Sequence, residues 1–91
     1  MKRAVQIEPN DNVAVVMEEV SAGETVVLDG TGEMVTAVTA IPFPHKISLV
    51  DIPEGATIYK YGCPIGWANT DIRKGEHVHV HNVDFPNMQE T

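Results

Sequence analysis

Apolar residues recur with a helical period in one part of the chain, close to its start. Four of them are spaced i, i+3, i+4 and i+7: Val13, Val16, Met17 and Val20. This spacing places them in one stripe along a helix. Asn10 or Asp11 can supply the N-cap oxygen, and Gly23 offers a left-handed exit. The pattern therefore predicts one short helix over residues 13–20, which needs to dock on a sheet because it is too short to be stable alone.

Elsewhere the apolar residues are mostly β-branched and come in short runs between turn residues, which is typical of strands. The predicted strands cover residues 25–28, 34–40, 47–50, 57–61 and 76–83. Residues 41–44 are expected to form a loop or a sheet edge, because Pro42 and Pro44 cannot donate a ladder hydrogen bond. The sequence thus predicts a mostly β domain with one helix.

One short pattern occurs three times: an apolar residue, two variable residues, glycine, two variable residues, and another apolar residue. It covers residues 20–26, 52–58 and 72–78. The shared glycine predicts a tight turn with a positive φ angle. The copies are separated by 32 and 20 residues, which excludes a solenoid with a fixed period. The pattern alone is equally compatible with three unrelated turns that lead into strands.

The charge balance excludes two classes of partner. The net charge is −7, from 13 acidic residues against 6 lysines and arginines, and the basic residues are adjacent only at Lys2-Arg3 and Arg73-Lys74. Nucleic-acid binding requires clustered cations that neutralise phosphates. The longest uninterrupted apolar run, residues 13–17, is far shorter than the roughly 20 residues of a membrane span. Neither a nucleic acid nor a membrane is therefore expected as a partner.

Length and cysteine content suggest a single cytoplasmic domain. The 91 residues are predicted to form one domain over residues 1–91, with a core at about 7–83 and a loose tail at 84–91. The single cysteine, Cys63, excludes an internal disulfide, and we expect it to pack in the β core, as we do Trp67. No export signal is predicted, because Glu8 and Asp11 stand where its apolar stretch would be.

Three histidines, His77, His79 and His81, are separated by single valines. On a strand all three imidazoles would share one face, and both valines would point into the core. Neighbours would lie about 6.5 Å apart, close enough to bind one ion, whereas the outer two would lie about 13 Å apart. The predicted unit is therefore His79 with His81, completed by His45, and suits zinc, iron or manganese. A solvated strand face without any ligand is the alternative.

Lys46 and Lys60 are candidates for binding a carboxylate, since only 6 basic residues occur in this acidic chain. A hydroxyacid substrate needs a positive partner for its carboxylate, and a cation or metal stabilises the charge that forms when the neighbouring proton is removed. The alternative for both is a surface lysine with a partly buried aliphatic stem.

The second half of the chain carries an ordered set of motifs. They read PHKISL at 44–49, DIPEG at 51–55, KYGCPIGWA at 60–68 and DIRKGEHVHVHN at 71–82, and DNVAV at 11–15 precedes them. The set resembles the small N-terminal domain of altronate and galactarate dehydratases, the domain type called SAF, over roughly residues 7–83. The sequence departs from that pattern at Phe43-Pro44-His45, where a glycine commonly precedes the histidine.

The resemblance implies a β-clip (SAF-type) fold: mostly β, with one short helix. In long members of the family this domain is fused to a large catalytic domain. In others it is a separate chain paired with a large subunit, as in sulfolactate sulfo-lyase, and a chain of this length resembles the second arrangement. The implied activity is the elimination of water, or of a similar group, from a hydroxyacid or sugar acid, with a divalent metal and a large catalytic lyase subunit.

Within that activity, His45, His79 and His81 are the predicted catalytic or metal-binding residues. Lys46, Lys60 and Asn82 are the predicted substrate-binding residues. The isolated chain is expected to be inactive, because a small domain leaves little room for a deep pocket. The alternative is a non-catalytic module that holds a sugar acid or a partner chain, and self-association into a homo-oligomer is compatible with either function.

Overall fold

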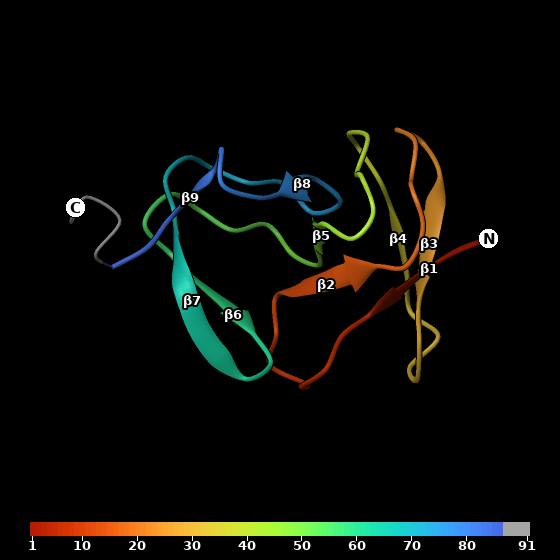
Figure 1. The fold of residues 1–91 in the computed structure, drawn as a ribbon, viewed down its shortest axis with the longest axis horizontal. Coiled ribbons are helices and arrows are strands. Elements are labelled where there is room, and N and C mark those ends of the chain that lie inside the picture. Colours follow the sequence, from red (N-terminus) through yellow and green to blue (C-terminus); the bar gives the residue numbers. More distant parts are fainter. Residues whose placement is uncertain (87–91) are drawn as a thin grey trace.

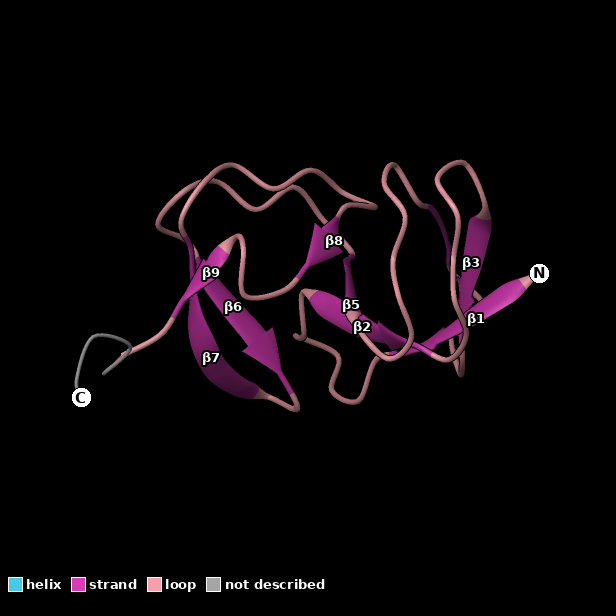
Figure 2. Cartoon of the chain, turned by 45° about the horizontal axis from the view of Figure 1, so that its top comes forward, coloured by secondary structure: helices cyan, strands magenta, loops and turns pink. Residues whose placement is uncertain are grey.

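The computed structural model describes residues 1–86, which form two β-sheets and no helix (Figures 1 and 2). The strands are β1 (Lys2–Val5), β2 (Val13–Val16), β3 (Thr25–Leu28), β4 (Met34–Thr36), β5 (Lys46–Ser48), β6 (Thr57–Lys60), β7 (Cys63–Ala68), β8 (His77–Val78) and β9 (Val83–Asp84). The mostly β class is therefore confirmed. Residues 1–86 contain no helix long and apolar enough to cross a membrane.

The larger sheet has six strands in the order β4-β3-β1-β2-β5-β8, and the smaller has three in the order β6-β7-β9. All neighbours are antiparallel except β1 and β3, which are parallel. β1 occupies a central position, where Ala4 pairs with Val16 on one side and with Leu28 on the other. The smaller sheet lies at the opposite end of the molecule from β3 and β4 (Figure 1). Because Ala4 of β1 is fully buried, the packed part of the chain begins before residue 7, the position at which it was expected to begin.

The predicted helix over residues 13–20 is wrong, because Val13–Val16 form strand β2 and Val20 makes an isolated bridge with Ile41. The run Val-Ala-Val-Val is β-branched at three of four positions, which favours a strand over a helix. Met17, the third residue of the helical stripe, is 44% exposed. The apparent helical period arose from a strand and a turn in which Val13, Val16 and Val20 are all buried.

The three glycine turns are confirmed. Gly23, Gly55 and Gly75 have φ angles of 90°, 87° and 89°, a region that side chains disfavour. Gly75 also lies against the larger sheet: a Cβ atom there would be 2.1 Å from the carbonyl oxygen of Thr36. The other two glycines have open space at the same position. Only the third turn is thus held by close packing as well as by backbone conformation.

Two apolar cores lie on either side of β2. The first packs between the strands of the larger sheet and the loops around Val20 and Ile41, and it includes Ala14 and Val16. The second packs under the smaller sheet and includes Val13, with Ile58 and Val78 among its other members. Since adjacent residues of a strand point to opposite faces, β2 contributes to both cores.

A two-residue turn at Tyr61 and Gly62 joins β6 to β7, with φ angles of 58° and 73° that match a type I′ hairpin. Asp11 holds this turn from the other end of the chain. Its carboxylate accepts the backbone N–H of Tyr61 at 3.0 Å and of Gly62 at 2.7 Å, and also that of Glu8. Burial raises the pKa of Asp11, but these donors outweigh it and leave the pKa below its usual value.

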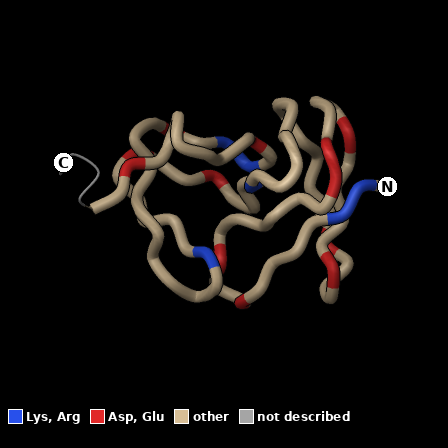
Figure 3. The backbone as a smooth tube through the Cα atoms, in the orientation of Figure 1, with Lys and Arg blue, Asp and Glu red and all other residues tan. Residues whose placement is uncertain are grey.

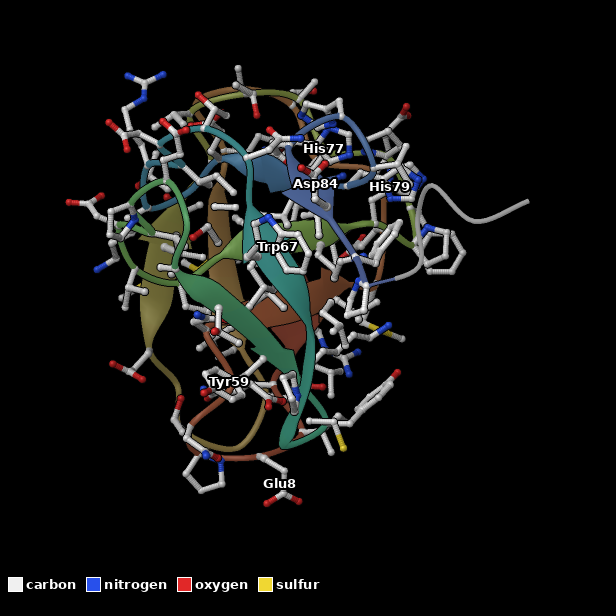
Figure 4. The ribbon with its side chains drawn as sticks, turned by 90° about the vertical axis from the view of Figure 1, so that its left-hand side faces the viewer. Glu8, Tyr59, Trp67, His77, His79 and Asp84 are labelled. Atoms are coloured by element: carbon white, nitrogen blue, oxygen red, sulfur yellow. The ribbon has the colours of Figure 1, made fainter. Side chains whose placement is uncertain are left out.

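Several predicted core positions are exposed. Cys63, at the start of β7, is exposed, and Trp67 is 39% exposed on the outer face of the smaller sheet (Figure 4). Val80 is 58% exposed, because β8 ends at Val78 and the alternation of a strand ends with it. The predicted loose tail begins inside structured chain, since Asp84 belongs to β9 and Phe85 packs on the second core. Residues 87–91 of that tail lie outside the described residues.

Candidate functional site

Strand pairing brings two histidines from distant parts of the chain face to face. In the antiparallel register of β5 and β8, Ile47 pairs with His77 and Lys46 pairs with Val78. His45 immediately precedes β5 and His79 immediately follows β8, so the same register places these two residues opposite each other. Figure 4 shows His77 and His79 close together at one edge of the molecule.

The three rings of His45, His77 and His79 form one contact group. His45 Nδ1 and His77 Nε2 are 2.8 Å apart, with ring centroids 5.0 Å apart, so they share a hydrogen bond in which one nitrogen carries the proton. His45 stacks on His79 with centroids 3.7 Å apart. One nitrogen from each residue lies within 4.8 Å of the others, and the buried Nδ1 of His79 has no hydrogen-bond partner. This unpaired nitrogen is available to a ligand.

The surroundings lower the pKa values of His77 and His79, which favours their neutral forms. Burial lowers the pKa of His77 to about 4, with further contributions from His81, His45, His79 and Lys46. Burial also lowers the pKa of His79, together with His45, Lys46 and His81. Every side chain that contributes to these shifts is a histidine or a lysine, and none of the described carboxylates does. Neutral rings keep the lone pairs that a metal ion or a donated proton requires.

Asn82 holds the loop that follows β8. Its side-chain oxygen accepts the backbone N–H of His79 at 3.0 Å, and its side-chain nitrogen donates to the carbonyl of His77 at 2.8 Å. Asn82 is 1% exposed. In this arrangement it positions the two histidines, and the substrate contact predicted for it would require the loop to open.

His81, predicted as a ligand, lies outside the group of three nitrogens, and His77 takes its place. His81 is exposed, and its ring is tilted by 38° against that of His77, with centroids 4.9 Å apart. The prediction assumed a continuous strand over residues 76–83, but β8 contains two residues. The i, i+2 spacing of His77 and His79 would have been enough to predict this pair if the end of β8 at Val78 had been known.

Of the two candidate lysines, Lys46 lies near the histidines, since its charge contributes to the lowered pKa values of His77 and His79. Lys46, which follows His45, has its pKa lowered by burial and by the nearby charge of Lys60. Lys60 places its Nζ 4.7 Å from the ring centroid of Tyr61. The ion pairs of the described residues are Arg3–Asp29 and Arg73–Glu76, so neither lysine belongs to one. Figure 3 shows how few basic positions this acidic chain has.

The lowered histidine pKa values predict that the metal-free chain loses stability in mild acid. The folded state takes up a proton at His77 only near pH 4, whereas the unfolded chain takes it up near the ordinary value of 6.5. Stability is therefore complete above pH 6.5 and falls as the pH drops toward 4. Urea unfolding at pH 7 and pH 4.5 should show a loss on the order of 1–2 kcal/mol, after allowance for solvent screening.

The variant His77→Gln is the control for this loss, and it should flatten the pH dependence over the same interval. Asp11 does not contribute there, because its pKa lies below 3.8. An unfolding free energy that stays constant between pH 7 and pH 4.5 would contradict the burial of these rings.

The fold and the site define a small all-strand domain, with three contacting imidazoles at one edge and Lys46 close to them. The chain belongs to the altronate/galactarate dehydratase SAF domain family, whose sequence profile matches residues 2–86. This confirms the resemblance inferred from the motifs.

Relatives of two kinds are similar to the chain. Altronate dehydratase of Escherichia coli (strain K12) is 42% identical over 78 residues, and that of Bacillus subtilis (strain 168) is 42% identical over 82 residues. These matches cover 86% and 90% of the chain but 15% and 16% of the two dehydratases. (2R)-sulfolactate sulfo-lyase subunit alpha of Chromohalobacter salexigens is 44% identical over 73 residues, which cover 76% of the chain and 78% of that subunit. The chain thus corresponds to a small part of the dehydratases and to most of the sulfo-lyase subunit.

Proposed function

We propose that the chain is the small SAF component of a hydroxyacid or sugar-acid lyase and acts with a large catalytic lyase subunit in the cytoplasm. Two comparisons support this proposal. The chain matches 78% of a protein named as a subunit of a lyase, and it matches about one sixth of dehydratases that carry further sequence. The reaction would be elimination of water or of a similar group, and the site would be completed by residues of the large subunit.

The proximity of three imidazole nitrogens, within 4.8 Å of one another, carries the functional proposal. His45, His77 and His79 would hold a divalent metal such as iron, manganese or zinc. Their donor type suits these ions, and the unpaired Nδ1 of His79 is a free donor. The nitrogens of His45 and His77 now share a proton at 2.8 Å, so for both to bind the ion this proton would move to the other nitrogen of its own ring and the rings would turn.

When bound, the metal would polarise the carboxylate or hydroxyl group of the acid. The chain's own cations would act separately, with Lys46 holding the substrate carboxylate and Lys60 supplying further positive charge nearby. None of the described carboxylates contributes to the lowered pKa of Lys46, His77 or His79, so an incoming anion meets little competition there. An acid substrate would also restore the charge balance that two neighbouring lysines lack.

The purified chain is predicted to bind the metal but to have no lyase activity. Titration with Mn²⁺ or Zn²⁺, followed by calorimetry, should give saturable binding. Altronate, galactarate and sulfolactate should not be turned over by the chain alone, and one of them should be turned over once the large subunit is added. Turnover by the chain alone would refute the proposal that catalysis requires the large subunit. Substrate binding without turnover in the complete complex would favour the alternative, a non-catalytic binding module.

A further inference from the structure

An apolar groove of about 240 Å³ lies on β1 and β2. It is lined by Val5, Ile7, Val15, Met17 and Tyr61. Three of these side chains are strongly exposed: Ile7 by 50%, Met17 by 44% and Tyr61 by 53%. A group of exposed apolar side chains that share one groove is typical of an interaction surface rather than of scattered surface residues.

The groove is the uncovered continuation of a buried face. Val13 and Val15 point to the same side of β2, and Val5 of β1 pairs with Val15. Val13 is buried under the smaller sheet, whereas Val15 lies where that sheet no longer covers β2. The tip of the β6–β7 hairpin, with Tyr61, forms one wall. The domain thus leaves part of an apolar sheet face open.

Two lysines flank this groove. Lys46 pairs with Val15 across β2 and β5, and the Nζ atom of Lys60 lies over the ring of Tyr61. The two ammonium groups are close enough for Lys60 to lower the pKa of Lys46, and the ion pairs found in residues 1–86 include neither. An apolar surface with unpaired positive charge at its edge complements an apolar segment that carries carboxylates.

We propose that this groove is the docking surface for the large catalytic subunit, which would place an apolar side chain between β1 and the hairpin and a carboxylate against Lys60. This inference rests on the proposed function. A second copy of the chain fits the surface poorly, because a symmetric contact would bring the same lysines of both copies together. Lys46 lies on β5, the strand that begins directly after His45, so a subunit seated here contacts the sheet that positions the histidine group.

The test compares the same substitution at two exposed methionines in complexes with the purified large subunit. Met17→Asp places a charge in the groove and should weaken association at least 10-fold. Met34→Asp, on β4 at 60% exposure, should change it less than 2-fold. Lys60→Glu should slow association at low salt, and Lys74→Glu, outside the groove, should not. Thermal melts of each variant alone establish that all remain folded.

A chemical probe gives an independent readout. Acetylation of lysines should be suppressed at Lys60 in the complex and unchanged at Lys2 and Lys74. Failure of the wild-type chain to bind the large subunit would overturn the proposed function itself. Normal binding that Met17→Asp and Lys60→Glu leave intact would overturn only the docking surface. A dimer of the isolated chain that Met17→Asp dissociates would assign the groove to self-association instead.

Discussion

Replacing Gly75 by alanine is expected to lower the free energy of unfolding by about 3–5 kcal/mol, a large part of the stability of so small a domain. A side chain at a φ of 89° costs about 1–2 kcal/mol by itself. The new Cβ would also lie 2.1 Å from the carbonyl oxygen of Thr36, so the turn before β8 must move away from the larger sheet. Urea unfolding followed by circular dichroism measures this loss.

Gly23→Ala and Gly55→Ala are matched controls, because both glycines have the same φ region and nothing within 4 Å of the added Cβ. Each should lose only about 1–2 kcal/mol. An equal loss at all three positions would show that backbone conformation alone decides the outcome. Gly75→Ala should also disturb the site, since His77 follows Gly75 by two residues.

The second large effect concerns the proposed metal site. His79→Gln removes the donor with the unpaired buried Nδ1 and should weaken metal binding by about 100-fold or more, because loss of outer partners alone already costs 10–100-fold. Activity of the reconstituted enzyme should fall in parallel. His81→Gln is the matched control: it is two residues away, exposed, and outside the group of three nitrogens, so it should change metal affinity by less than 3-fold.

Titration calorimetry of each variant with Mn²⁺ or Zn²⁺ separates the two outcomes, and thermal melts of the metal-free chains show whether they remain folded. Strong loss in both the His79 and the His81 variants would restore the ligand pair expected from strand alternation. Normal metal affinity in the His79 variant together with weakened association with the large subunit would assign the histidine to the interface.

The sequence predicted strands well where they were β-branched and bounded by turn residues, as at Thr25–Leu28. It failed at β1, because Lys2–Val5 contains two basic residues and becomes a central strand only through the partners on either side. It failed at β7, since Pro64 and Gly66 argue against a strand. Gly66 in fact lets the carbonyl of Asp84 approach: a Cβ there would be 2.3 Å away. Such contacts are set by distant residues and leave no local signal.

The site was predicted in part. His45 and His79 were expected to act together, and the structure stacks their rings, although nothing local relates two residues 34 positions apart in the sequence. The third member was misassigned, since alternation holds only while a strand continues, and Asn82 closes a turn directly after Val78. The side-chain amide of Asn82 thus limits the length of β8, whereas the sequence alone predicted Asn82 as a substrate-binding residue.

The position of β2 between the two cores affects how the molecule unfolds. Its residues alternate between the two apolar cores, with Val13 in one and Ala14 and Val16 in the other. Neither core can unfold without exposing one face of β2 to solvent. The carboxylate of Asp11, two residues before β2, also hydrogen-bonds the β6–β7 hairpin to the same segment. The two halves are therefore coupled and should melt in a single transition, without a half-folded intermediate that exposes β2 to aggregation.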